Sequence, residues 1–225
     1  MAPSSPDFAT DAFLTDARNR MVDSQLRPNK VSDPRILEAM RHLPRERFVP
    51  PGLAALAYAD QTVGPHDGCV MLQPMALARL AQAAAPLKGE TALVIGMGAG
   101  YAAALLAALG CAVTVLEASP ASLERTRRAL GDTAVILAAG PLVAGWAAGG
   151  PYDLILIDGA VPSIPAAIAA QLRPETGRLL TVMGDGQTSR AVHAEPAPAG
   201  LSIRTLFDCP CPVLADFVPA PVFAF

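Results

Sequence analysis

A glycine-rich turn is the first feature of this sequence that could do chemistry. The apolar run 92–95 leads into Gly96-Met97-Gly98-Ala99-Gly100-Tyr101, and a helix is predicted to follow. Glycines at such a turn let the backbone approach a ligand closely and aim the N–H groups of the helix at it. Glu117 ends the next predicted strand, 21 positions after Gly96. An acidic residue at that place accepts hydrogen bonds from ribose hydroxyls, so the pair predicts a nucleoside site.

Three interpretations of the turn compete. Glycines spaced G-x-G-x-G directly after the first strand suit S-adenosylmethionine, which has no pyrophosphate to seat. A dinucleotide motif G-x-G-x-x-G fails from Gly96, because position 101 is Tyr, and from Gly98 it survives only in the form that ends in Ala103. The glycines could also serve only to pack the helix on the sheet, although Glu117 in register argues against that. No Gly-Lys-Ser/Thr follows, so a P-loop is absent.

Other reactive side chains form no recognisable constellation. His42, His66 and His193 are scattered along the chain, and no Ser-His-Asp or paired-carboxylate arrangement is evident. Cys209-Pro210-Cys211 is too closely spaced for a zinc knuckle, so we expect no metal site. Asp158 lies at the end of the fourth predicted strand, where a ligand contact and a helix or turn cap are equally good interpretations.

Length and composition favour one large α/β domain, or a core domain with a small appendage. Of the 225 residues 52% are hydrophobic, and the formal net charge is −3. That charge gives no electrostatic reason to expect nucleic acid or an anionic membrane as a partner. No stretch reaches 18 uninterrupted apolar residues, and residues 1–16 do not look like a secretory signal, so we expect the cytoplasm. The oligomeric state is not predicted.

Two parts of the chain differ in pattern. Residues 1–88 read as a helical N-terminal appendage with substrate-side loops, and residues 89–225 as a Rossmann-like domain. In the second part apolar runs at 92–95, 111–116, 133–137, 152–157 and 178–182 alternate with helical segments at 101–109, 119–130 and 165–172. Continuous apolar strands separated by helices predict a doubly wound parallel sheet covered on both faces.

The end of the chain has a different pattern. Leu201–Phe207 alternates weakly, and Phe217–Phe225 is rich in aromatic and β-branched residues. Two late strands without a helix between them predict an antiparallel pair at the edge of the sheet. Residues 184–200, rich in Gly, Ala and Pro, are expected to form a loop.

Several segments together resemble the protein-L-isoaspartate O-methyltransferase family, a class of S-adenosylmethionine-dependent enzymes. Residues 44–50 (PRERFVP) match the family's "PRE-x-FVP" and residues 57–60 (AYAD) its "AY-x-D". Leu72-Gln73-Pro74 lies where the family has Ser-Gln-Pro, and residues 96–101 match its glycine motif. Shorter matches follow at residues 151–153, 171–172, 177–179 and 184. The resemblance covers residues 21–184.

The resemblance implies methyl transfer from S-adenosylmethionine to the carboxylate of an L-isoaspartyl residue in a damaged protein or peptide. The residues that would hold the cofactor are Gly96, Gly98, Gly100, Glu117, Ala139, Gly140 and Asp158. Those that would border the substrate are Asp60, Leu72 and Gln73.

The sequence departs from the family at important positions. Val70 and Leu72 replace a threonine and a serine, and Val94 replaces the acidic residue that opens the glycine motif. Ala139 replaces an Asp that lies near the adenine. We expect the loss of the serine at Leu72 to lower turnover. Two alternatives stay open: a catalytically silent S-adenosyl-ligand-binding protein on this fold, and an NAD-dependent oxidoreductase, which the matches in residues 1–88 disfavour.

Overall fold

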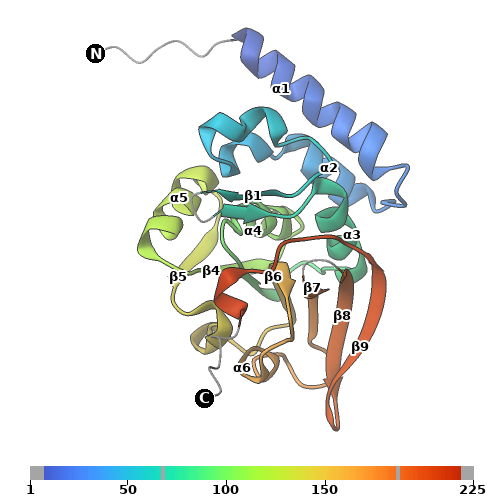
Figure 1. Ribbon diagram of the computed structural model, residues 1–225, viewed down its shortest axis with the longest axis vertical. Helices are drawn as coiled ribbons and strands as arrows, with labels where there is room; N and C mark the ends of the chain where they lie inside the picture. The colour runs from blue at the N-terminus through green and yellow to red at the C-terminus, as the bar shows by residue number, and fades with distance from the viewer. Residues whose placement is uncertain (1–7, 67–68, 186–187, 219–225) are drawn as a thin grey trace, which may run out of the picture.

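The centre of the protein is a seven-stranded sheet in the order β5-β4-β3-β6-β7-β8-β9 (Figure 1). The computed structural model describes residues 8–66, 69–185 and 188–218. The strands are β3 Thr91–Ile95, β4 Ala112–Glu117, β5 Val135–Ala139, β6 Leu154–Val161, β7 Arg178–Gly184, β8 Ser189–Ala197 and β9 Gly200–Asp208. Strands β3 to β7 pair in parallel, whereas β8 and β9 are antiparallel. The predicted doubly wound sheet with antiparallel edge strands is confirmed.

Both faces of the sheet are covered by apolar side chains, which explains why its central strands are continuously hydrophobic. Along β3, Ala92 and Val94 belong to one hydrophobic cluster, and Leu93 and Ile95 belong to a second cluster on the opposite face. Successive side chains of a strand point to opposite faces, so the residues of a central strand are mostly apolar on both faces.

Helices form much of the N-terminal region and connect several of the strands. They are α1 Phe8–Met21, α2 Pro34–His42, α3 Pro74–Ala84, α4 Gly100–Ala108, α5 Pro120–Leu130 and α6 Ala166–Ala169. Shorter helical segments are η1 Val22–Leu26, η2 Arg45–Phe48, η3 Pro51–Leu56, η4 Leu142–Ala144, η5 Ala147–Gly149 and η6 Ala215–Phe217. Helix α2 has a capped start, since the Asp33 side chain accepts a hydrogen bond from the backbone of Arg35 and Pro34 occupies the first turn. None of the helices in the described ranges is long and apolar enough to cross a membrane.

The N-terminal region is more than a helical layer. It contains a two-stranded antiparallel sheet, β1 Val63–His66 with β2 Cys69–Met71, which the sequence did not predict. Met21, Leu26 and Met40 lie in the same hydrophobic cluster as Val94 and the buried face of α4. The two parts of the chain therefore share one core.

The C-terminal region differs from two predictions. Residues 184–200 were expected to form a loop, but Ser189–Ala197 is strand β8, paired with both β7 and β9. Leu201–Phe207 lies within β9, as predicted. Phe217 is buried at the end of η6, and residues 219–225 of the second predicted strand lie outside the described residues. The helix predicted at 165–172 is confined to α6 Ala166–Ala169.

Candidate functional site

The glycine turn joins β3 to α4, and its three glycines are needed for different reasons. Gly98 has a φ of +96°, a backbone conformation that residues other than glycine rarely adopt. A Cβ on Gly96 would lie 3.2 Å from the backbone oxygen of Asp158, so this glycine lets β3 and β6 come together. A Cβ on Gly100 would lie 3.0 Å from the ring of Phe48 and from the methyl group of Thr126. Gly100 therefore serves the packing of α4 in this structure.

Glu117 faces the glycine turn from the end of β4. Its side chain is fully buried, and its carboxylate accepts hydrogen bonds from the Thr126 hydroxyl at 2.6 Å and from the Gly98 N–H at 3.2 Å. Burial raises the pKa of Glu117, and these two donors oppose the shift. The hydroxyls of a bound nucleoside would reach Glu117 by replacing these donors.

Ala139 and Gly140 continue the site at the end of β5. Ala139 is the Cα partner of Glu117 across the β4–β5 pair, and the Gly140 N–H donates to the Glu117 backbone oxygen at 3.0 Å. A Cβ on Gly140 would meet only Leu116 at 3.8 Å and Trp146 at 3.9 Å. Apolar side chains and free space beside a glycine suit a flat heterocycle, so these residues fit an adenosyl group.

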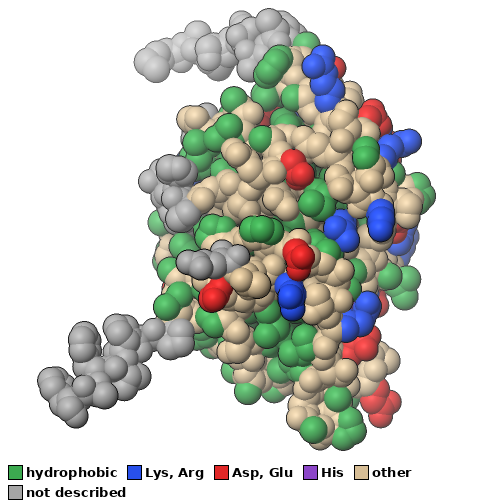
Figure 2. All heavy atoms as spheres, turned by 45° about the vertical axis from the view of Figure 1, so that its right-hand side comes forward, with side chains coloured by type: hydrophobic (Ala, Val, Ile, Leu, Met, Phe, Trp, Pro, Cys, Tyr) green, Lys and Arg blue, Asp and Glu red, His purple; other side chains and the backbone are tan. Residues whose placement is uncertain are grey.

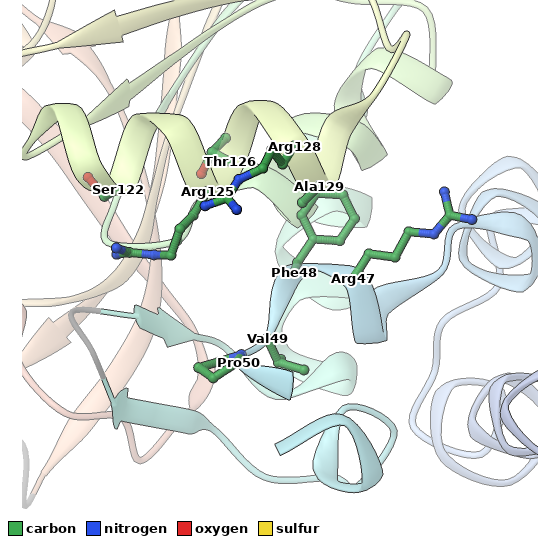
Figure 3. A pocket seen from close by; sticks show the side chains of 10 residues that line it. Arg47, Phe48, Val49, Pro50, Ser122, Arg125, Thr126, Arg128 and Ala129 are labelled. Atoms are coloured by element: carbon green, nitrogen blue, oxygen red, sulfur yellow. The ribbon is translucent and has the colours of Figure 1, made fainter. Parts of the chain in front are cut away.

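A cavity of about 400 Å³ lies beside the turn, between η2 and α5. Figure 3 shows Phe48 below Thr126 and Ala129, with the side chain of Arg47 pointing away. The cavity reaches the predicted site at Gly98 and at Thr126, which is the hydrogen-bond partner of Glu117. Its lining residues are Arg47, Phe48, Val49, Pro50, Gly98, Ser122, Arg125, Thr126, Arg128 and Ala129. Thr126 could not be singled out from the sequence, because a threonine within a helix does not by itself indicate a binding site.

Two of the predicted substrate-side residues come together in a second cavity of about 390 Å³. Asp60 and Gln73 line it together with Gln61 and Thr62. The opposite wall is Pro210-Cys211-Pro212, which is far away in the sequence. The cavity therefore joins the N-terminal region to the segment that follows β9.

Leu72 does not line this cavity. Its side chain is fully buried in the core, and its backbone oxygen accepts a hydrogen bond from Arg45. Arg45 is itself fully buried, donates to the backbone oxygen of Ala57 at 2.7 Å and lies 4.8 Å above the ring of Tyr101. One arginine thus fixes the Leu72 loop to η2, η3 and α4. Nothing in the sequence distinguishes this arginine from the exposed Arg47.

The cofactor side and the substrate side are directly connected. The N–H of Val70, in β2, donates to the backbone oxygen of Met97 in the glycine turn at 2.6 Å. The loop that precedes Gln73 is therefore held against the turn by main-chain contact.

Asp158 lies within β6, beside Gly96, and is completely buried. Neither carboxylate oxygen has a hydrogen-bond partner of normal geometry in the described part of the chain. Burial raises the pKa of Asp158 to about 7, with Glu117 adding to the shift and with Arg45 and the Leu72 backbone opposing it. Asp158 also contributes to raising the pKa of the Cys211 thiol to about 12, after burial and Cys209. The β-bridge between Ala160 and Val213 brings strand β6 beside the segment that lines the second cavity.

Comparison with known proteins finds the same family repeatedly. The family described as Protein-L-isoaspartate(D-aspartate) O-methyltransferase (PCMT) matches residues 16–204. A protein-L-isoaspartate O-methyltransferase of Methylorubrum extorquens is 42% identical over 178 residues, covering 77% of each chain. One from Rhodopseudomonas palustris is 35% identical over 220 residues, covering 95% of this chain and 87% of its own.

Solved structures share the fold. A beta-aspartate methyltransferase (PCMT) structure from Plasmodium falciparum, in complex with S-adenosyl-L-homocysteine, has a TM-score of 0.73 at 16% identity. The match covers 88% of this chain and 98% of that chain. A second protein-L-isoaspartate O-methyltransferase structure has the same TM-score at 23% identity, covering 88% of this chain and 65% of that one.

Proposed function

Since the chain belongs to the protein-L-isoaspartate O-methyltransferase family, we propose that the turn from Gly96 to Gly100 and the ends of β4 and β5 hold S-adenosylmethionine, and that the cavity beside Gln73 receives the isoaspartyl residue. The main support for this assignment is that the residues of the proposed site lie close together. Residues from the ends of β3, β4 and β5 meet at one edge of the sheet, and the Val70–Met97 hydrogen bond attaches the substrate loop to that edge.

The reaction is the S-adenosylmethionine-dependent methylation of an isoaspartyl carboxyl group, the first step in repairing the damaged residue. S-adenosylmethionine supplies the methyl group from its sulfonium, and the electrons of the broken C–S bond stay on sulfur. A carboxylate is already ionised near neutral pH, so no strong base is needed. The chain has to align the carboxylate oxygen with the methyl carbon and keep water away.

Each side of the site has a defined role in this proposal. Glu117 accepts hydrogen bonds from the ribose, Gly98 brings backbone close to the ligand, and Ala139 and Gly140 border the adenine. On the substrate side, the exposed carboxylate of Asp60 accepts hydrogen bonds from the substrate backbone, and the Gln73 amide donates to the substrate carboxyl group.

We also propose that the protein works in the cytoplasm. Cys111, Cys209 and Cys211 are all buried as free thiols, which suits a reducing compartment. On the face that Figure 2 shows, acidic and basic side chains are interspersed, so that face offers no single-sign patch for a polyanionic partner.

One pair of measurements tests the proposal. Isothermal titration should show binding of S-adenosylmethionine and S-adenosylhomocysteine, with NAD as the control that does not bind. A labelled-methyl assay should show transfer to an isoaspartyl peptide and none to the same peptide with a normal aspartyl residue. Binding without any transfer would favour the silent binding protein, and binding of NAD alone would favour the oxidoreductase.

A further inference from the structure

An incoming carboxylate loses its water when it enters a closed site and needs hydrogen-bond donors in return. The loop that leads to the substrate cavity offers few. Val70, Met71 and Leu72 are apolar and buried, and the side chains that line the cavity from the N-terminal region are those of Asp60, Gln61, Thr62 and Gln73. A further donor deeper in the site would offset the lost hydration.

Asp158 is a buried polar group next to the loop that leads to this cavity. It is fully buried and adjoins Gly96 of the glycine turn on one side and the Leu72 backbone on the other. The chain that follows it runs beside the wall of the substrate cavity, since the Leu214 N–H donates to the Ala160 backbone oxygen at 2.8 Å. Ala160 forms a β-bridge with Val213, which directly follows the cavity-lining Pro212. Neither oxygen of Asp158 has a hydrogen-bond partner of normal geometry in the described part of the chain, although the Leu72 backbone lies close enough to lower its pKa.

We propose that Asp158 carries a proton during catalysis and that its O–H donates a hydrogen bond to the isoaspartyl carboxylate, holding it for attack on the methyl group. This inference rests on the function proposed above. A protonated carboxyl group is a good donor, whereas an ionised one only accepts and would repel an anionic substrate. The proton stays on Asp158 throughout. The new bond joins the substrate oxygen to the methyl carbon, and the C–S bond breaks.

The charges around Asp158 shift its pKa in both directions. In the described residues, Glu117 on β4 favours the protonated form of Asp158, and Arg45 on η2 opposes it. Cys211 follows β9 and is a neutral thiol near neutral pH, because its pKa is raised to about 12. The substrate carboxylate is a like charge and therefore favours retention of the proton, while the sulfonium opposes it. Burial is the largest contribution and decides the balance.

The test compares Asp158→Asn with Asp158→Ala in the full chain. The amide of asparagine donates a hydrogen bond at every pH, whereas alanine donates none. The expected kcat/KM of the wild type for an isoaspartyl peptide is constant below about pH 7 and falls by up to about tenfold per unit above it, following ionisation of one group. Asp158→Asn should keep a rate within roughly threefold of the wild type at about pH 6 and lose the decline, whereas Asp158→Ala should be at least roughly tenfold slower than the wild type at about pH 6 and also lack the decline.

Controls separate this role from others. Asp132→Asn makes the same chemical change at an exposed position and should leave the pH profile as in the wild type. S-adenosylhomocysteine affinity, measured by titration, should change by less than roughly threefold in both Asp158 variants. An Asp158→Asn protein as inactive as Asp158→Ala would show that the ionised form is required and would overturn the proposal. Loss of S-adenosylhomocysteine binding in both variants would make Asp158 a cofactor residue instead.

A second readout does not depend on turnover. The infrared spectrum of the wild type with S-adenosylhomocysteine and an isoaspartyl peptide at about pH 6 should contain the C=O band of a buried protonated carboxyl group, absent from Asp158→Asn. If this band is missing, the inference fails even though methyl transfer is observed. If the band is present but no isoaspartyl peptide is methylated at any pH, the proposed function fails, and the role given to Asp158 fails with it.

Discussion

In the proposed site, Glu117 is the side chain on which cofactor binding should depend most directly. Replacing it with Gln keeps its shape but removes the charged acceptor, so S-adenosylhomocysteine affinity should fall by roughly 1–3 kcal/mol, measured by titration calorimetry. Thr126→Val is the matched control, because it removes the donor that occupies Glu117 in the free protein. That variant should bind the ligand as well as the wild type. Equal losses in both variants would indicate disturbed packing around α5 rather than a lost ribose contact.

Variants of Leu72 test whether turnover is limited by the absence of the serine hydroxyl that the family has at this position. Because Leu72 is fully buried, Leu72→Ser and Leu72→Ala should both lower the free energy of unfolding by roughly 2–5 kcal/mol, measured by urea denaturation. The two variants leave a similar cavity, so their difference in kcat/KM for an isoaspartyl peptide isolates the hydroxyl. We expect the serine variant to be the faster of the two. Equal rates would mean that a hydroxyl at position 72 does not reach the substrate.

Spacing along the chain predicted the residues that depend on local structure. Gly96, Gly98 and Glu117 follow from strand ends that meet at one edge of a parallel sheet, and the structure places them together. The burial of Asp158 and Arg45 could not be predicted in this way. It results from contacts with the Leu72 loop and with the segment around Cys211, which are distant in sequence and carry no periodic signal.

At the scale of elements, Arg45 connects the short helices η2 and η3 to the Leu72 loop. Arg45→Met keeps much of the side-chain volume but removes the donors to the backbone oxygens of Ala57 and Leu72. Two buried carbonyl groups would lose their partner, so the free energy of unfolding should fall by roughly 2–5 kcal/mol in urea denaturation. Arg47→Met replaces the exposed arginine of the same motif and should change the free energy of unfolding by less than about 0.5 kcal/mol. Similar losses in both variants would contradict this anchoring role.

Strand β8, which lies next to the edge strand β9, was the hardest element to predict. Ser189–Ala197 contains small residues and Pro196, a composition typical of loops. Ala191, Val192 and Ala194 are nevertheless buried, because β8 pairs with β7 on one side and β9 on the other. Pairing with existing strands overrode local propensity. Pro196 is tolerated near the end of the strand, where few ladder bonds remain to be made.

For the molecule as a whole, Asp158 makes stability depend on pH. Burial raises the pKa of its carboxyl group from 3.8 to about 7, so between these values the folded protein holds a proton that the unfolded chain has released. The free energy of unfolding should therefore fall as the pH rises through this window, by roughly 3–5 kcal/mol in all, with the loss complete above about pH 7. Urea denaturation of the wild type and of Asp158→Asn at several pH values checks this, since the difference isolates one group. If the free energies of unfolding of the wild type and of Asp158→Asn changed in parallel with pH, this prediction would be wrong.

The hydrogen bond between Val70 and Met97 has a consequence for how the two substrates influence each other. Anything that orders the glycine turn also orders the loop before Gln73, because the two share a main-chain contact. Binding of the adenosyl ligand then lowers the entropic cost of binding the peptide. Thermodynamic linkage requires the peptide to tighten the adenosyl ligand by the same factor. The two substrates would then bind cooperatively, and S-adenosylhomocysteine should tighten the binding of an isoaspartyl peptide.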